Sequence, residues 1–181
     1  PGAAVPHGMI QPSPDTRIYE WDACSGYHYS DSTINGFSHT HLSGTGCGDY
    51  GDILLMPTVG KQDYRYLGAE SQQTAYASPF SHSRETAIPG YYSVMLDRYQ
   101  VKAELTATER VGFHRYTFPA TEEANLIFNI GTRMGESGPV RDASVTYTDD
   151  GRIEGWVVTE PAYVDIYQKG ATVTMYFSAV L

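Results

Sequence analysis

The chain has 181 residues, which is enough for one domain with a sizeable buried core, and its formal net charge is −9 at pH 7. Its 12 Lys and Arg residues are outnumbered by 21 Asp and Glu residues. Phosphate binding needs clustered positive charge, so a nucleic-acid partner is not expected. No apolar run reaches the roughly 18 residues that a transmembrane helix needs, and no membrane partner is expected either.

The N-terminal half of the chain predicts few regular elements and long loops. We expect an irregular entry with one short strand at residues 5–11, and a second strand at residues 53–56 that Pro57 ends. Residues 61–77 are polar and show neither helical nor strand periodicity, which predicts an irregular segment.

Residues 78–87 predict one short helix. Ser78 is a favourable N-cap residue, and Pro79 suits the first helical turn because its missing N–H is not needed there. No long amphipathic helix is predicted elsewhere. We therefore expect at most one or two short helices.

The chain from residue 91 onward predicts closely spaced strands rich in β-branched and aromatic residues. A turn is expected at residues 148–151, where Asp150-Gly151 tolerates positive φ. About nine strands joined by short turns predict a mainly β protein, an antiparallel sandwich or barrel, in a single domain over residues 1–181. The strands are predicted at residues 53–56, 91–99, 101–106, 110–118, 126–130, 143–148, 153–159, 163–167 and 172–181.

The two ends of the sequence suggest a piece of a longer protein. The chain opens at Pro1 without an initiator Met, as a processed or cloned piece would. It closes on strand-like residues with no turn or polar tail, and a terminal strand of that kind would leave an unprotected sheet edge. We expect the natural protein to continue beyond Leu181.

Residues 21–52 differ in composition from the rest of the chain. They hold three of the six histidines and both cysteines, Cys24 and Cys47, but almost no aliphatic side chains. Such a segment cannot build its own core and is typical of functional loops laid over a scaffold. The two cysteines could form a disulfide in an oxidising compartment or remain free thiols.

His39 and His41 are candidates for a shared ligand. In a strand, residues i and i+2 lie on one face, so both imidazoles could hold zinc, with Asp49 or Asp52 completing the set. A metal-dependent hydrolase is one hypothesis on this basis. The flanking residues are glycines rather than Cys or Glu, which favours a hydrogen-bonding role for both histidines.

Trp21 lies close in sequence to Tyr27, His28 and Tyr29. Aromatic faces on loops can stack against sugar rings, while neighbouring polar groups bind the hydroxyls. Packing in the core or at its rim is the alternative for such rings. Several carboxylates lie in the same segment, but loop spacing cannot fix the separation that a glycosidase pair needs.

Several strings together resemble one family. They are PGAAVPHGMIQPSPDTR, SGYHYSDSTINGFSHTHLSGTGCGDYGDILLMP, FSHSRETAIPGYY and ELTATERVGFHRYTFP, and they span roughly residues 1–120. In this order they resemble the N-terminal domain of glycoside hydrolase family 92, a family of calcium-dependent, exo-acting α-mannosidases. His7 departs from the family pattern, which usually has Phe at this position.

The resemblance implies a β-sandwich that packs on a C-terminal (α/α) barrel, which this chain lacks. The barrel would supply the catalytic acid and base of an inverting hydrolysis and hold the calcium, so no catalytic residue and no metal ligand is expected in this chain. The chain would contribute one wall of a pocket for mannose-containing glycans, with α-1,2 linkage as the expected specificity. The resemblance also suggests an extracytoplasmic protein.

By the same resemblance, Trp21 is the first candidate for contact with the leaving-group sugar. Cys24, His28, His39 and His41 are further candidates for lining the pocket. The alternative for the histidines is loop stitching, in which each imidazole bonds the backbone of its own loop. A stand-alone carbohydrate-binding module is the alternative to the mannosidase function.

Overall fold

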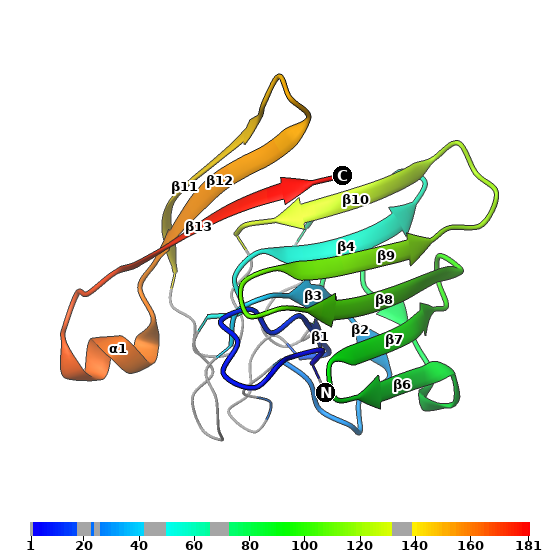
Figure 1. Cartoon of the computed structure of the whole chain (residues 1–181), viewed down its shortest axis with the longest axis horizontal. Helices are drawn as coiled ribbons and strands as arrows, with labels where there is room; N and C mark the ends of the chain where they lie inside the picture. The colour runs from blue at the N-terminus through cyan, green and yellow to red at the C-terminus, as the bar shows by residue number, and fades with distance from the viewer. Residues whose placement is uncertain (1, 18–22, 24–25, 42–49, 66–72, 132–138) are drawn as a thin grey trace.

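The structure is a computed structural model that describes residues 2–17, 23, 26–41, 50–65, 73–131 and 139–181. Its described residues form antiparallel sheets and a single α-helix (Figure 1). The prediction of a mainly β, antiparallel sandwich is confirmed. Residues 163–167, which were predicted as a strand, instead form most of that helix, α1 (Ala162–Tyr167). The alternation of apolar and polar residues over so short a run does not separate a strand from a helix.

One four-stranded sheet has the strand order β1-β3-β4-β10, so it joins segments distant in sequence. Its strands are β1 (Ser13–Asp15), β3 (Gly36–Ser38), β4 (Leu54–Val59) and β10 (Ala124–Asn129). The prediction that Pro57 ends the strand is wrong. On the side of β3, β4 pairs only through Phe37 and Leu55, so Pro57 lies where that side has no strand partner and a missing N–H is tolerated.

The second four-stranded sheet is a meander in sequence order, β6-β7-β8-β9. Its strands are β6 (Glu85–Ile88), β7 (Tyr91–Leu96), β8 (Val101–Ala107) and β9 (Gly112–Thr117). Short turns and strict cross-strand register follow from the alternating pattern that the sequence shows here. The strands predicted at residues 91–99, 101–106 and 110–118 are confirmed with small shifts at their ends.

The two four-stranded sheets enclose the core. Phe37 of β3 and Tyr92 of β7 are both fully buried, with ring centroids 6.5 Å apart. Cross-strand neighbours on β7 and β8 place their apolar side chains on the same inner face. The core residues of these sheets are Phe37, Met56, Tyr92, Val94, Leu96, Val101, Ala103 and Leu105.

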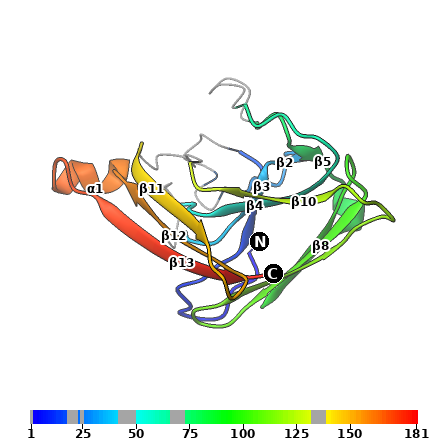
Figure 2. The same cartoon turned by 90° about the horizontal axis from the view of Figure 1, so that it is seen from above.

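A three-stranded sheet, β11-β12-β13, follows at the C-terminal end of the chain. It contains β11 (Val140–Tyr147), β12 (Arg152–Thr159) and β13 (Val173–Val180), with α1 between the last two (Figure 1). From above, this sheet and the β6–β9 meander lie on opposite sides of the view (Figure 2). The predicted turn at residues 148–151 is confirmed, since Gly151 has φ 85° and the Thr148 N–H donates to the Arg152 carbonyl at 2.8 Å.

The prediction of a helix at residues 78–87 is wrong. The segment forms β5 (Ser78–Pro79), which pairs with β2 (Thr33–Ile34), then a 3-10 turn at His82–Arg84, then β6. Ser81 rather than Ser78 caps the turn, and pairing of β6 with β7 outweighs the local helical signal. No strand forms at residues 5–11, and the first strand is β1.

Gly36 lies where the backbones of β3 and β4 approach closely. A Cβ at this position would lie 2.7 Å from Leu54 Cγ and 2.9 Å from the Leu55 carbonyl oxygen, and the φ of 155° is unusual for other residues. We expect Gly36→Ala to lower the free energy of unfolding by roughly 2 kcal/mol or more, measured by chemical denaturation.

Gly131→Ala is the matched control for this substitution. A Cβ at Gly131 would meet nothing closer than the Asn129 Oδ1 at 3.8 Å. We expect its effect to stay within about 0.5 kcal/mol. Equal stabilities of the two variants would contradict the close approach at Gly36.

Candidate functional site

A polar cavity of about 300 Å³ lies among the N-terminal loops. Its lining carries hydroxyl, carboxylate, guanidinium and amide groups, which suits a hydroxyl-rich ligand rather than an apolar one. The lining residues are Thr16, Arg17, Ser30, Asp31, Ser32, Thr33 and Gln73. Three of them, Ser30, Asp31 and Ser32, lie in the loop before β2, and Thr33 begins β2. Residues 21–52, singled out for their composition, thus contribute four of the seven lining residues.

Asp31 is the charged centre of this cavity wall. The Arg17 Nε–H donates to both Asp31 carboxylate oxygens, at 3.0 and 2.8 Å, and the Thr16 hydroxyl donates to Oδ2 at 2.7 Å. The Thr16 Oγ1 in turn accepts the His28 backbone N–H at 2.9 Å. These contacts fix the carboxylate and the guanidinium before any ligand binds, which reduces the entropy that binding has to offset.

The same loop is held to the meander by the Glu85 carboxylate at the start of β6. Tyr92 donates its hydroxyl to Oε1 at 2.7 Å, Tyr27 donates to Oε2 at 3.1 Å, and the His82 Nδ1–H donates to Oε2 at 2.6 Å. Burial, together with the nearby carboxylate, raises the pKa of both tyrosines above the ordinary value, so both remain donors. Glu85 therefore joins the loop to the core.

His82 ties the loop at a second point. Its Nε2–H donates to the Tyr29 carbonyl at 2.8 Å, and its ring stacks on the Tyr29 ring with centroids 4.2 Å apart. The two ring nitrogens of His82 therefore face two acceptors, the Tyr29 carbonyl and the Glu85 carboxylate. The residue lies in the 3-10 turn that replaces the predicted helix.

His28 takes part in loop stitching. The Ser30 backbone N–H donates to its Nδ1 at 3.3 Å, and the Ser30 hydroxyl lies 2.8 Å from the same nitrogen. Because Ser30 lines the cavity, His28 is placed beside the cavity wall. Trp21 and Cys24, the two other candidates from this part of the sequence, lie outside the described residues, as does Cys47.

His39 forms a hydrogen-bonded row with His114 and Tyr116 of β9. His39 Nδ1–H donates to the Ile53 carbonyl at 2.6 Å, so its Nε2 accepts from the His114 Nε2–H at 2.8 Å. The Tyr116 hydroxyl then donates to the His114 Nδ1 at 2.7 Å. Every donor in the row meets an acceptor when both imidazoles are neutral.

Burial enforces this neutral state. It lowers the pKa of His39 to about 4 and that of His114 to about 3, and in each case the other histidines nearby lower it further. A proton on the His39 Nε2 would place a second donor against the His114 Nε2–H. The row is thus a structural connection between the loop after β3 and the meander.

His41 points to different partners. Its Nδ1–H donates to the Gln11 carbonyl at 3.0 Å, and its Nε2 lies 2.8 Å from the Ser38 hydroxyl, which donates to the Asp15 Oδ1 at 2.9 Å. Asp15 and Ser38 are fully buried, and burial raises the pKa of Asp15 although His41 and Ser38 oppose the shift. This cluster connects β1 to the end of β3.

His39 and His41 therefore do not face one ligand. β3 ends at Ser38, so the strand geometry that would align residues 39 and 41 on one face is absent. In the part of the chain that the structure describes, no three His, Cys, Asp or Glu side chains are grouped closely enough to hold a metal ion. Asp49, one proposed partner, lies outside that part, and Asp52 is buried against Thr40.

The sequence reasoning missed four residues that the geometry makes important. All four lie in strings that carried the family resemblance but were assigned no role there: Arg17, His82, Glu85 and His114. The sequence feature that could have indicated them is a charged or imidazole side chain within a segment that otherwise resembles a strand or a turn. Only the fold brings them to the loop, since Glu85 and Tyr27 are 58 residues apart.

Comparisons with known proteins agree with this architecture. The model of the glycosyl hydrolase family 92 N-terminal domain matches residues 1–181. A solved α-mannosidase of this family, BT3965 from Bacteroides thetaiotaomicron in complex with mannoimidazole, is 36% identical and covers 99% of this chain and 22% of its own, with a TM-score of 0.87. The family glycosyl hydrolase ccman5 is 31% identical and covers 98% of this chain and 23% of its own, with a TM-score of 0.72.

A curated relative from Arthroderma benhamiae, described as an uncharacterized secreted glycosidase, is 30% identical over 123 residues, which are 66% of this chain and 15% of that protein. This chain thus spans less than a quarter of the length of the relatives that it matches. Among the described residues, no helix has the length and apolar character needed to cross a bilayer.

The neutral histidine row makes stability depend on pH. The folded pKa values of His39 and His114 lie below the ordinary value of about 6.5, so the unfolded state binds more protons in mildly acidic solution. The stabilisation is complete above pH ~6.5 and is lost as the pH falls towards 4. We expect a loss of about 1–2 kcal/mol per histidine at pH 5, measured by denaturant unfolding across pH.

His114→Gln should make this pH dependence shallower, because one of the two coupled groups is removed. His7→Asn is the control: His7 is exposed, and Asn tolerates its positive φ of 61°. The control should keep the wild-type slope. A stability that does not change between pH 7 and 5 would contradict the buried neutral row.

Proposed function

Because this chain belongs to glycosyl hydrolase family 92, whose N-terminal domain it represents, we propose that it is part of an exo-acting, inverting α-mannosidase. The proposed substrates are mannose-containing glycans, with the α-1,2 linkage as the preferred one. Support comes from the family match and from the 36% identity to a solved α-mannosidase that binds mannoimidazole. An extracytoplasmic location is proposed by analogy with the relative described as secreted.

The observation that carries the proposal is the polar cavity held by Arg17 and Asp31. A sugar ring presents hydroxyls as both donors and acceptors, and this wall offers fixed groups of both kinds. Asp31 accepts from Arg17 and Thr16 and is therefore oriented for a hydroxyl donor, while Gln73 and the serine hydroxyls can both donate and accept. Trp21, four residues after Arg17 in the chain, is the proposed stacking surface for the leaving-group sugar.

The residues that line the cavity do not include the pair of carboxyl groups that an inverting glycosidase needs. Inversion uses two carboxyl groups roughly 6.5–9.5 Å apart, one to protonate the leaving oxygen and one to activate water. Asp31 is the single carboxylate among the residues that line this cavity, and it is paired with Arg17. We propose that the acid and the base come from a C-terminal (α/α) barrel of the same polypeptide, which packs against this wall.

Calcium is proposed as the cofactor of the whole enzyme. It prefers several oxygen ligands and would help to position the sugar and the attacking water. The described residues do not group the carboxylates that such a site requires. We propose that the calcium ligands lie on the barrel and that this chain binds and orients the sugar.

Trp21→Ala in the full-length protein tests the stacking surface. We expect a loss of at least about tenfold in kcat/KM on mannobiose but little change on an activated aryl mannoside, whose leaving group needs no stacking. The assay is run with calcium and with chelator, and activity should fall with chelator. An unchanged mannobiose rate would place Trp21 outside the leaving-group site.

Asp31→Asn tests the cavity itself. Removing the charge weakens the pair with Arg17 and frees the guanidinium to move, so we expect kcat/KM for both substrates to fall by at least about tenfold. Asp63→Asn is the matched control, because Asp63 accepts from the Arg65 Nε at the same 3.0 and 2.8 Å but is exposed. Equal activity of both variants would contradict the assigned cavity.

A further inference from the structure

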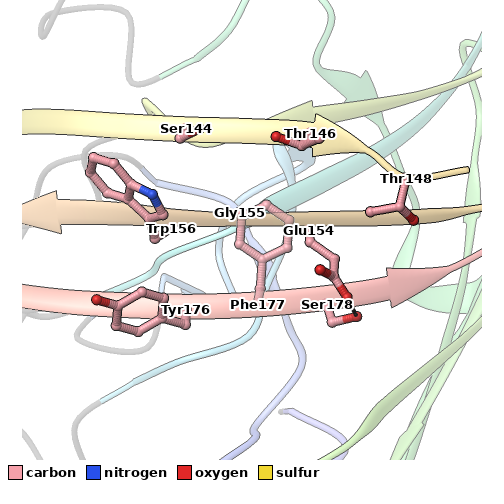
Figure 3. A pocket seen from close by; sticks show the side chains of 9 residues that line it. All are labelled: Ser144, Thr146, Thr148, Glu154, Gly155, Trp156, Tyr176, Phe177 and Ser178. Carbon is pink, nitrogen blue, oxygen red and sulfur yellow. Dashed lines mark hydrogen bonds between the residues drawn. The ribbon is translucent and has the colours of Figure 1, made fainter.

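A second and larger hollow, of about 670 Å³, lies on the three-stranded sheet β11-β12-β13. Its volume falls within the range of roughly 300–1,000 Å³ that is typical of ligand sites. It shares no residue with the Arg17–Asp31 cavity. We call it the outer-sheet hollow, and its lining residues are Ser144, Thr146, Thr148, Glu154, Gly155, Trp156, Tyr176, Phe177 and Ser178 (Figure 3).

The register of the sheet places the polar and aromatic side chains of this hollow on one face. Ser144 pairs with Trp156, which pairs with Tyr176, and in the next row Thr146 pairs with Glu154, which pairs with Ser178. Directly opposed residues project to the same side, so the six side chains form two parallel rows. Figure 3 shows the Trp156 and Tyr176 rings side by side on neighbouring strands.

On β13 this face is the outward one. Along β13, residues 174, 176, 178 and 180 are exposed, whereas their neighbours are half-buried, and Tyr176 has 74% of its surface exposed. The opposite face carries the apolar side chains of Val157 and Met175, which are cross-strand neighbours. Val157 is fully buried. On β12 and β13 the sheet thus has an apolar inner face and a hydroxyl-rich outer face on which a Trp and a Tyr are placed together, whereas on β11 both faces carry exposed side chains.

The chemistry of the outer-sheet hollow selects its ligand class. The adjacent rings offer apolar faces for stacking, and the hydroxyls of Ser144, Thr146 and Ser178 offer both donors and acceptors. Glu154 is the one charged residue of the lining, and its Oε1 lies 4.0 Å from the Nη1 of Arg152, which lies outside the lining. The lining itself therefore offers no cation to an anionic ligand. A purely apolar partner would leave the hydroxyls and the carboxylate unpaired. A neutral, hydroxyl-rich ring satisfies both the aromatic and the polar groups.

We propose that the outer-sheet hollow is a second glycan-binding site, in which Trp156 and Tyr176 stack on successive sugar rings of an uncharged oligosaccharide. The Glu154 carboxylate accepts from the Ser178 hydroxyl at 3.2 Å and is thereby positioned to receive a sugar hydroxyl. An open surface of this kind holds a polymer chain without enclosing its end. It would keep a polysaccharide near the exo-acting site that the proposed function assigns to the N-terminal loops.

Affinity electrophoresis of the full-length protein through gels containing soluble mannan tests this site. The choice of mannan rests on the proposed function. We expect mannan to retard the wild type, and Trp156→Ala or Tyr176→Ala to weaken the apparent binding at least about tenfold. Hydrolysis of an aryl mannoside should stay at the wild-type rate in both variants, because neither residue lines the Arg17–Asp31 cavity.

Tyr64→Ala is the matched control, since Tyr64 has 69% of its surface exposed and lies outside the sheet. It should migrate as the wild type does. Tyr176→Cys provides a second measurement: rapid maleimide labelling that mannan slows supports an open glycan site. Slow labelling without mannan would show that another part of the protein covers the face and would overturn the proposal. The proposal would also be overturned if mannan retarded Tyr176→Ala as strongly as the wild type. If the wild-type protein did not hydrolyse the aryl mannoside, only the proposed function would be contradicted.

Discussion

The arrangement of the N-terminal loops depends on the hydrogen bonds that the Glu85 carboxylate accepts. It receives hydrogen bonds from Tyr92 in the core, from Tyr27 in the loop and from His82 in the 3-10 turn. Its side chain is only 8% exposed, so these donors replace the solvation that the buried charge has lost. A loop with almost no aliphatic side chains thereby obtains a fixed position from polar contacts to a β-sheet that folds on apolar contacts.

Two histidines of residues 21–52 also connect loops to strands through hydrogen bonds. His39 is joined to β9 through His114, and His41 is joined to β1 through Ser38 and Asp15. Each imidazole adds a polar connection between segments that are distant in the sequence. Hydrogen bonds thus give the N-terminal loops a rigid base, as the proposed binding wall requires.

The two hollows that we propose as sugar sites differ in character. The Arg17–Asp31 cavity is small, charged at its centre and fixed by hydrogen bonds, which suits one terminal sugar held in one orientation. The outer-sheet hollow is larger and open, and its Trp and Tyr offer contact area with little directional demand. On a polymeric substrate, the cavity would bind the terminal sugar while the outer-sheet hollow would hold the rest of the chain.

Local patterns in the sequence determined the β-rich class, the meander over residues 91–118 and the turn at Gly151, because strand periodicity and turn chemistry depend on neighbours in the chain. The family resemblance determined the sandwich and the proposed sugar-binding role. The tertiary structure decided that residues 78–87 pair as strands around a 3-10 turn, and that His39 and His41 diverge to separate partners. It also decided that Arg17, Asp31 and Glu85 organise the site. Hydrogen bonds between residues as far apart as Tyr27 and Glu85 have no local signature, so their partners are known only once the sheets have placed them together.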